Sequence, residues 1–200
     1  MIERIIQYTA ALAISTAASY TLGVYHAENT KPPEVSPVPI EKVEVHNLEY
    51  NGPYSSLSEV NSNDEQRRCL ALNIYHEAKN QSDRGKRAVA LVTLNRVMSD
   101  RYPDTICGVV KQGRYDNGKF ELHKCQFSWF CNGVSDKPTH EKSWKKSLDI
   151  ANMIIDNSSN QHDYTDGSLW YHADYVSPEW SKRLNKTVKI QDHIFYNKEN

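Results

Sequence analysis

The distribution of proline limits where this chain can form a compact domain. Five of its eight prolines stand between residues 32 and 53, in a segment rich in Glu, Ser and Asn. Because such a segment carries few large apolar side chains, it stays extended and acts as a spacer. We therefore expect a flexible linker over residues 28–62 and a folded domain over residues 63–200.

The segment before this linker has the length of a membrane-spanning helix. Residues 5–24 carry no charged side chain, although several hydroxyl groups interrupt the apolar run, and about 20 residues suffice to cross a bilayer as a helix. Two interpretations of residues 1–27 stay open. We favour a retained signal anchor over a cleaved signal peptide, because Tyr25 occupies the −3 position of the nearest candidate cleavage site. Either one predicts a domain in the periplasm, anchored at the inner membrane or exported.

The charge balance argues against one class of partner. The chain has 24 Lys and Arg against 25 Asp and Glu, a formal net charge of −1, whereas proteins that bind DNA or RNA through phosphates carry a basic excess. Twelve tyrosines and four tryptophans instead favour a groove in which aromatic rings hold an extended polar ligand. We expect a monomer without a nucleic-acid partner.

Hydrophobic spacing predicts a mainly helical domain. Three helices are expected, over residues 65–79, 83–99 and 140–157, with a short helical turn within residues 104–112. Residues 113–138 are expected to be a long loop that carries aromatic side chains. Short β-prone pieces follow, at residues 169–172, 187–190 and 194–196. The predicted fold class is α+β, mainly helical with a small β element.

All four cysteines lie in the expected domain, at Cys69, Cys107, Cys125 and Cys131. An even number behind an export segment indicates an oxidising compartment and two disulfides. Three pairings are possible; the short spacing of Cys125 and Cys131 favours a bridge between them, which leaves Cys69 for Cys107. Reduced core cysteines stay open as an alternative, as does zinc binding, although this spacing matches the usual C-x-x-C pairs poorly.

Glu77 is the candidate catalytic residue. In a helix, Leu70, Ile74 and Glu77 share one face, so the carboxyl group continues an apolar stripe. Its partial desolvation raises its pKa, which keeps it protonated near neutral pH, as protonation of a glycosidic oxygen requires. The alternative is an exposed glutamate at a helix end. A zinc-protease motif fails, because it needs His at position 80, where this chain has Asn80.

Six sequence blocks occur in an order typical of one protein family. They span residues 69–79, 85–97, 102–107, 125–133, 169–180 and 193–196. In this order they resemble the SleB/CwlJ family of cell-wall hydrolases, in the four-cysteine type found in Gram-negative bacteria and their phages. The family motif Gly-Glu-Ala-Arg-Gly-Glu corresponds to residues 76–81, which places the family's catalytic glutamate at Glu77.

The resemblance implies a lysozyme-like or lytic-transglycosylase-like catalytic domain that degrades peptidoglycan. A lytic transglycosylase uses one glutamate as acid and then as base, without metal or cofactor, and makes a 1,6-anhydro product. A muramidase that uses water generally needs a second carboxylate about 5–9 Å away. Four acids are candidates for that partner, and none lies in a motif that demands it: Asp116, Glu121, Asp136 and Asp174.

Several polar and aromatic residues are expected to bind the substrate around Glu77. They are Gln126, Ser128, Trp129, Tyr171, His172 and Trp180. A loop closed by Cys125 and Cys131 would hold Gln126 and Ser128 in place, while Tyr171, His172 and Trp180 would offer ring faces to sugars. A purely structural role is the alternative for His172. Asn95 and Arg96 are expected to pack and to form hydrogen bonds away from the chemistry.

Two other functions stay open. One is an N-acetylmuramoyl-L-alanine amidase, which usually needs zinc on a His/Glu/His cluster that the eight histidines of this chain do not form in sequence. The other is a wall-binding module without catalysis. The weakly apolar segment at residues 5–24 also resembles the signal-arrest-release segments of some phage endolysins. This resemblance implies a protein that stays tethered until the membrane potential collapses.

Overall fold

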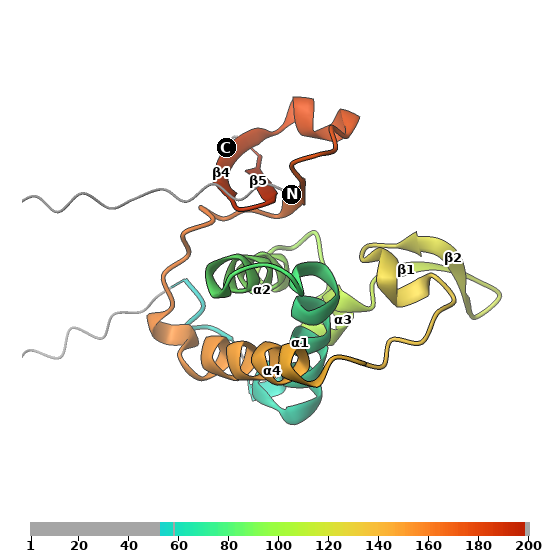
Figure 1. Ribbon diagram of the computed structural model, residues 1–200, viewed down its shortest axis with the longest axis horizontal. Helices are drawn as coiled ribbons and strands as arrows, with labels where there is room; N and C mark the ends of the chain where they lie inside the picture. Colours follow the sequence, from blue (N-terminus) through green and yellow to red (C-terminus); the bar gives the residue numbers. More distant parts are fainter. Residues whose placement is uncertain (1–52, 58, 199–200) are drawn as a thin grey trace, which may run out of the picture. The chain divides into compact units, whose positions relative to one another are not determined.

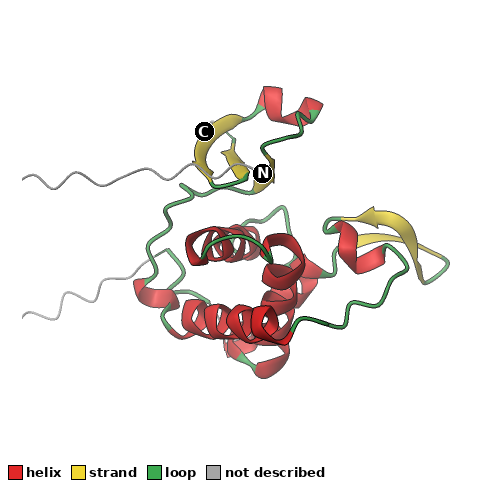
Figure 2. Cartoon of the chain, viewed as in Figure 1, coloured by secondary structure: helices red, strands yellow, loops and turns green. Residues whose placement is uncertain are grey.

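The computed structural model describes residues 53–57 and 59–198. Its α-helices are α1 (Asp64–Ala78), α2 (Asp83–Val97), α3 (Ile106–Val110) and α4 (Glu141–Asp156). Its strands are β1 (Gly113–Asp116), β2 (Lys119–Cys125), β3 (Trp170–Ala173), β4 (Asn185–Ile190) and β5 (His193–Asn197). Short 3-10 turns complete the fold as η1 (Glu59–Ser62), η2 (Ser128–Cys131), η3 (Ser158–Asn160) and η4 (Glu179–Arg183) (Figures 1 and 2).

Local capping sets where the helices begin. The side chains of Asn63, Ser82, Thr105 and His140 each accept a hydrogen bond from the backbone N–H three residues later. Such bonds satisfy donors that the first turn of a helix leaves unpaired. The three long helices and the short one were all predicted, with ends that differ by no more than two residues. The mainly helical α+β class is confirmed.

Helix α1 lies at the centre of the helical core. It packs against α2, α3 and α4, as Figure 1 shows. Its Leu70 and Ile74 are fully buried, together with Leu91 and Leu94 of α2 and Ile154 of α4. Burial of such side chains is the main driving force for folding. Leu70 and Ile74 therefore form the buried stripe that the sequence predicted for the face that ends in Glu77.

The folded domain begins earlier than the expected residue 63. Tyr54 is 1% exposed, and its hydroxyl group donates a 2.6 Å hydrogen bond to Asn95 Oδ1. Residues 53–57 and 59–62, which were expected to belong to the linker, therefore contribute an aromatic ring and the η1 turn to the domain. The rest of the linker and the predicted anchor lie outside the described residues. Within residues 53–57 and 59–198, no helix is long and apolar enough to cross a bilayer.

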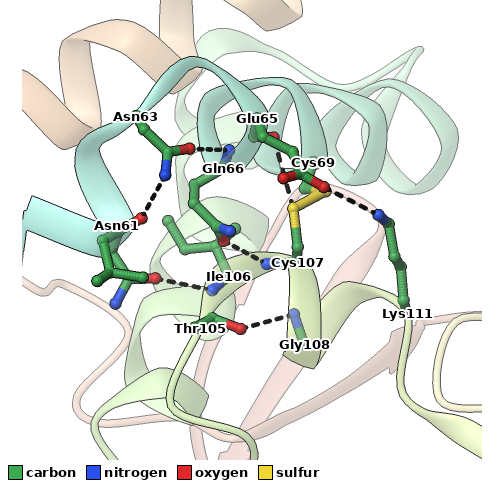
Figure 3. The surroundings of a disulfide bond; sticks show 11 residues. Asn61, Asn63, Glu65, Gln66, Cys69, Thr105, Ile106, Cys107, Gly108 and Lys111 are labelled. Atoms are coloured by element: carbon green, nitrogen blue, oxygen red, sulfur yellow. Dashed lines mark hydrogen bonds and ion pairs between the residues drawn. A yellow bond between two sulfur atoms is a disulfide. The ribbon is translucent and has the colours of Figure 1, made fainter.

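The two predicted disulfides are confirmed, with the favoured pairing. Cys69 bonds to Cys107 and Cys125 to Cys131. Figure 3 shows that the Cys69–Cys107 bridge is surrounded by polar contacts between α1 and the start of α3. Gln66 Oε1 accepts a 2.7 Å bond from the backbone N–H of Cys107, so α3 is docked on α1 by a covalent bond and by hydrogen bonds.

The segment expected as a long loop contains a β-hairpin. Strands β1 and β2 pair in antiparallel fashion through a turn at Asn117 and Gly118, whose φ angles are 48° and 75°. An Asn-Gly pair with two positive φ angles is the preferred two-residue hairpin turn, so the sequence carried a signal for this hairpin. The Cys125–Cys131 bridge then ties the end of β2 to η2.

The C-terminal residues form a three-stranded antiparallel sheet in the order β3-β5-β4, from the three β-prone pieces that the sequence predicted. Tyr171 pairs with Phe195, and Trp170 with Tyr196. Because side chains alternate across a strand, Tyr171 and Phe195 lie on one face and Trp170 and Tyr196 on the other. The first face packs on Ala88 and Val92 of α2, which brings β3 close to the end of α1.

Candidate active site

Glu77 is the penultimate residue of α1 and is half-buried. It continues the buried stripe of Leu70 and Ile74 to the point where the helix meets solvent. Burial raises the pKa of its carboxyl group, while a hydrogen bond from Tyr171 and the charge of Arg96 act in the opposite direction. The net shift is upward, so the protonated form persists at higher pH than in an ordinary glutamate.

Tyr171 contacts the carboxyl group directly. Its hydroxyl group donates a 3.0 Å hydrogen bond to Glu77 Oε2. The ring lies edge-on to His193, with centroids 5.3 Å apart, and packs against Phe195. Burial raises the pKa of the Tyr171 phenol well above its usual value, so this group donates its proton to the hydrogen bond and keeps it. The residue predicted as a sugar platform therefore holds the candidate acid.

Arg96 brings a buried positive charge to the same place. The residue is 3% exposed, and its Nε donates a 2.8 Å bond to the carbonyl oxygen of Leu169, just before β3. Its guanidinium group also lies over the rings of Tyr102 and Phe127. The positive charge of Arg96 lowers the pKa of Glu77. Burial lowers the pKa of the Arg96 guanidinium group itself. Arg96 was expected to pack and to form hydrogen bonds, as it does here, and its charge additionally acts on Glu77.

A surface hollow opens beside Glu77. Its lining comes from the end of α1 and the loop after it, and from the facing ends of β3 and β5. The residues are His76, Glu77, Ala78, Lys79, Asn80, Gln81, Ala173, Tyr175, Asp192 and His193. Gln81 Nε2 donates a 3.0 Å bond to Asp192 Oδ2, which links the two sides. His193 is buried, and burial lowers the pKa of its imidazole, so this side chain stays neutral near pH 7.

His193 and Arg96 were not among the predicted site residues. Both stand in sequence blocks that the family resemblance covers, at residues 193–196 and 85–97. No periodic spacing along the chain links either residue to Glu77, because His193 belongs to β5 and Arg96 to α2, whereas Glu77 belongs to α1. Only the packing of the sheet on α2 brings them to the end of α1.

Trp129 lies beside the hollow and is largely buried. Only 8% of its surface is exposed, and its indole N–H donates a 3.2 Å bond to Asn73 Oδ1. Its ring stacks on His76 with centroids 4.4 Å apart, and His76 Nε2 donates to the carbonyl oxygen of Asp136. Trp129 thus supports the His76 wall of the hollow, while its predicted contact with substrate stays a prediction.

Gln126 and Ser128 stand at the exposed junction between β2 and η2. The backbone N–H of Gln126 donates to the carbonyl oxygen of Gln112, which fixes the chain next to the Cys125–Cys131 bridge. Both side chains face solvent, and neither lines the hollow beside Glu77. Their proposed role in substrate binding stays a prediction.

His172 and Trp180 lie on the face of the sheet opposite to Tyr171. His172 Nδ1 contacts the carbonyl oxygen of Ala173, and Nε2 bonds to Tyr196 Oη at 2.9 Å. The His172 ring stacks on Tyr196, and Trp180 packs edge-on against both. The structure therefore separates this cluster from the hollow beside Glu77, and His172 has the hydrogen bonds of a structural histidine.

Three of the four candidate partner carboxylates are engaged elsewhere or exposed. Glu121 lies 3.7 Å from Arg114 on the hairpin, and Asp174 forms a 2.7 Å ion pair with Lys189. Asp116 is exposed at the hairpin turn. Burial raises the pKa of Asp136, which His76 partly offsets. In the part of the chain that the structure describes, no group of three or more His, Cys, Asp or Glu side chains is arranged to hold a metal ion.

Comparison with known proteins identifies the family. Residues 80–196 match the family described as Cell Wall Hydrolase. The chain belongs to this family. The matched segment covers α2, the hairpin, α4 and the sheet, and begins three residues after Glu77, so the match itself does not assign a role to the carboxyl group of this cell wall hydrolase.

Two solved structures are similar to this cell wall hydrolase. One is the catalytic domain of the SleB protein of Bacillus cereus, with 26% identity, a TM-score of 0.42, and coverage of 66% of this chain and 88% of the other. The second is the catalytic domain of SleB from Bacillus anthracis, described as a germination-specific lytic transglycosylase, with 25% identity, a TM-score of 0.45, and coverage of 68% and 96%. No curated protein sequence matches the chain.

Proposed function

We propose that this cell wall hydrolase cleaves the glycan strand of peptidoglycan, with Glu77 as general acid and base. The observation that carries the proposal is a carboxyl group with a raised pKa that opens on a surface hollow and is held by Tyr171. A protonated carboxyl group in such a place is suited to protonate a leaving glycosidic oxygen.

The chemistry follows from the two oxygens of Glu77. Tyr171 holds Oε2, so Oε1 carries the proton to the bridging oxygen as the bond from that oxygen to muramic C1 breaks. The carboxylate that results keeps the hydrogen bond from Tyr171 and is stabilised by the charge of Arg96. It then accepts the proton of the muramic C6 hydroxyl as that oxygen bonds to C1, which yields a 1,6-anhydro end and returns Glu77 to its acid form.

We favour this intramolecular closure over attack by water. Hydrolysis would use a second carboxylate about 5–9 Å from the acid, and Glu121 and Asp174 are occupied by ion pairs with Arg114 and Lys189. Asp136, next to His76, and Asp192, in the lining of the hollow, are the acids that a muramidase would have to use. A lytic transglycosylase needs only Glu77. A muramidase of the same strand is the alternative product chemistry, and the ends of the released fragments distinguish the two.

The decisive experiment is mass spectrometry of the fragments that the full chain releases from purified peptidoglycan. Anhydro-muramic ends support the transglycosylase, reducing ends support the muramidase, and free stem peptides would replace both with an amidase. Glu77→Gln should abolish release. Glu65→Gln is the matched control, because Glu65 lies on the same helix but is 70% exposed and pairs only loosely with Lys111, at 3.5 Å. Full activity of Glu77→Gln would overturn the proposal.

We further propose that the domain acts in the periplasm, tethered by residues 1–27 and released as an endolysin when the membrane potential collapses. Two disulfides suit an oxidising compartment. The full chain should then sediment with membranes and become soluble after depolarisation. The triple substitution Ser15→Leu, Thr16→Leu and Ser19→Leu should keep the protein bound to the membrane. A mature N-terminus between residues 17 and 30 without depolarisation would instead identify a cleaved signal peptide.

A further inference from the structure

The outer face of the C-terminal sheet, opposite to Tyr171, carries a second set of surface hollows. Trp170 of β3 lies on this face beside Tyr196 of β5, and Lys186 of β4 pairs with Tyr196 from the other side. Trp180 of η4 packs edge-on against Tyr196. Register and alternation place Trp170 and Lys186 together on this face, away from Glu77, and the contact with Tyr196 adds Trp180 to them.

Two adjoining hollows lie at these rings. One is lined by Trp170, Trp180, Arg183, Leu184 and Lys198. A second shares Arg183 and Leu184 with it and adds Lys182, Asn185 and Lys186. Because these two hollows share Arg183 and Leu184, their lining residues form one surface, which we call the basic aromatic face.

The basic aromatic face holds an excess of positive charge in a chain whose net charge is −1. Its charged side chains are Lys182, Arg183, Lys186 and Lys198. Lys182 is paired with Glu179 at 2.7 Å. Within residues 53–57 and 59–198, the other three cations have no ion-pair partner.

Unpaired cations around tryptophan rings fit a ligand that combines sugar rings with carboxylates. Ring faces pack against the apolar faces of sugars, and Arg and Lys bind carboxylate groups through charge-assisted hydrogen bonds. A peptidoglycan strand carries both, since its sugars bear stem peptides that end in carboxylates. A second contact on the same polymer would raise the effective concentration of the substrate at Glu77.

We propose that the basic aromatic face is a second peptidoglycan-binding site, which holds the strand away from the point of cleavage. The proposal rests on the proposed function for its choice of polymer. It assigns Trp180, which was predicted to line the catalytic groove, to this separate surface, and it gives Arg183 and Lys198 the role of binding stem-peptide carboxylates.

The test is co-sedimentation of the full chain with purified insoluble peptidoglycan. All proteins carry Glu77→Gln so that the polymer stays intact. Adding Arg183→Glu with Lys198→Glu should weaken binding about tenfold at low salt, because two attractions become repulsions. The matched control is Lys142→Glu with Lys145→Glu, which makes the same change in net charge at exposed positions of α4, and should bind as the parent does.

A second variant separates sugar contact from charge alone. Trp180→Ala should weaken sedimentation at high salt as well, whereas the charge reversals should lose their effect there. Circular dichroism and thermal melting establish that the variant is folded. The inference would be overturned if the variant with Arg183→Glu and Lys198→Glu bound as well as the parent, or if the α4 control lost as much binding. It would also be overturned if the parent bound heparin as tightly as peptidoglycan, because heparin reports general attraction to polyanions. Loss of cleavage by Glu77→Gln tests the proposed function separately.

Discussion

The phenolic oxygen of Tyr171 lies 3.0 Å from Oε2 of Glu77, although 94 residues separate them in the sequence. The bond joins the end of the central helix to the first strand of the C-terminal sheet. It gives Glu77 a fixed orientation and lowers its pKa against the larger effect of burial. The same contact therefore governs both the geometry and the proton affinity of the candidate acid.

Tyr171→Phe tests this contact. Loss of a hydrogen bond to a charged group costs about 1.5–3 kcal/mol, so we expect kcat on peptidoglycan to fall by about tenfold to a hundredfold. Because the bond lowers the pKa of Glu77, its removal should also move the loss of activity at alkaline pH to higher pH. Tyr115→Phe, at a tyrosine that is 61% exposed on the hairpin, is the control. An unchanged pH profile in Tyr171→Phe would contradict this reading.

Glu77→Gln should make the protein more stable at neutral pH. The folded pKa of Glu77 lies above its ordinary value of 4.5, so the folded state binds more protons than the unfolded state between these two pKa values. Stability is therefore full below pH 4.5 and falls as the pH rises through the folded pKa. Glutamine removes this loss. Thermal melting should show a higher Tm for the variant at pH 7 and a smaller difference at pH 4; a constant difference would argue against a buried, titrating Glu77.

Arg96 should act on Glu77 through charge and on β3 through its bond to Leu169. Arg96→Gln removes the positive charge, so the alkaline limit of activity should move to higher pH while kcat falls. Arg96→Lys keeps the charge, and we expect it to restore the pH limit without fully restoring kcat, because an ammonium group lacks the fixed geometry of guanidinium. Identical pH limits in both variants and the parent would assign Arg96 a purely structural role.

The two disulfides should differ in their effect on stability. Cys69 and Cys107 are 38 residues apart, and Cys125 and Cys131 are 6 apart. In the chain-entropy description, the longer loop contributes about 4 kcal/mol and the shorter about 2 kcal/mol. Urea unfolding of the double alanine variants should therefore show a larger loss for Cys69 and Cys107. A larger loss for Cys125 and Cys131 would show that local packing at η2, and not loop closure, controls stability.

Much of the helical part of this protein follows from local sequence. Asn63, Ser82 and His140 cap helices whose apolar spacing was already visible, and short-range rules of this kind need no tertiary information. The hairpin at residues 113–125 was also encoded locally, by Asn117 and Gly118, but the surrounding aromatic and glycine-rich sequence was interpreted as a loop. Glu77 was identified because it continues the stripe of Leu70 and Ile74 on one helix.

The surroundings of Glu77 depended on tertiary structure. Tyr171, Arg96 and His193 belong to a strand, a helix and another strand, and their approach to α1 comes from the packing of Phe195 and Ile190 on Ala88 and Val92. Strand register then decided which aromatic rings face Glu77: Tyr171 points to it, while the neighbouring Trp170 and His172 point away. The sequence by itself therefore determined the family, the helices and the candidate acid. Long-range packing decided which groups hold that acid, because such contacts leave no periodic pattern along the chain.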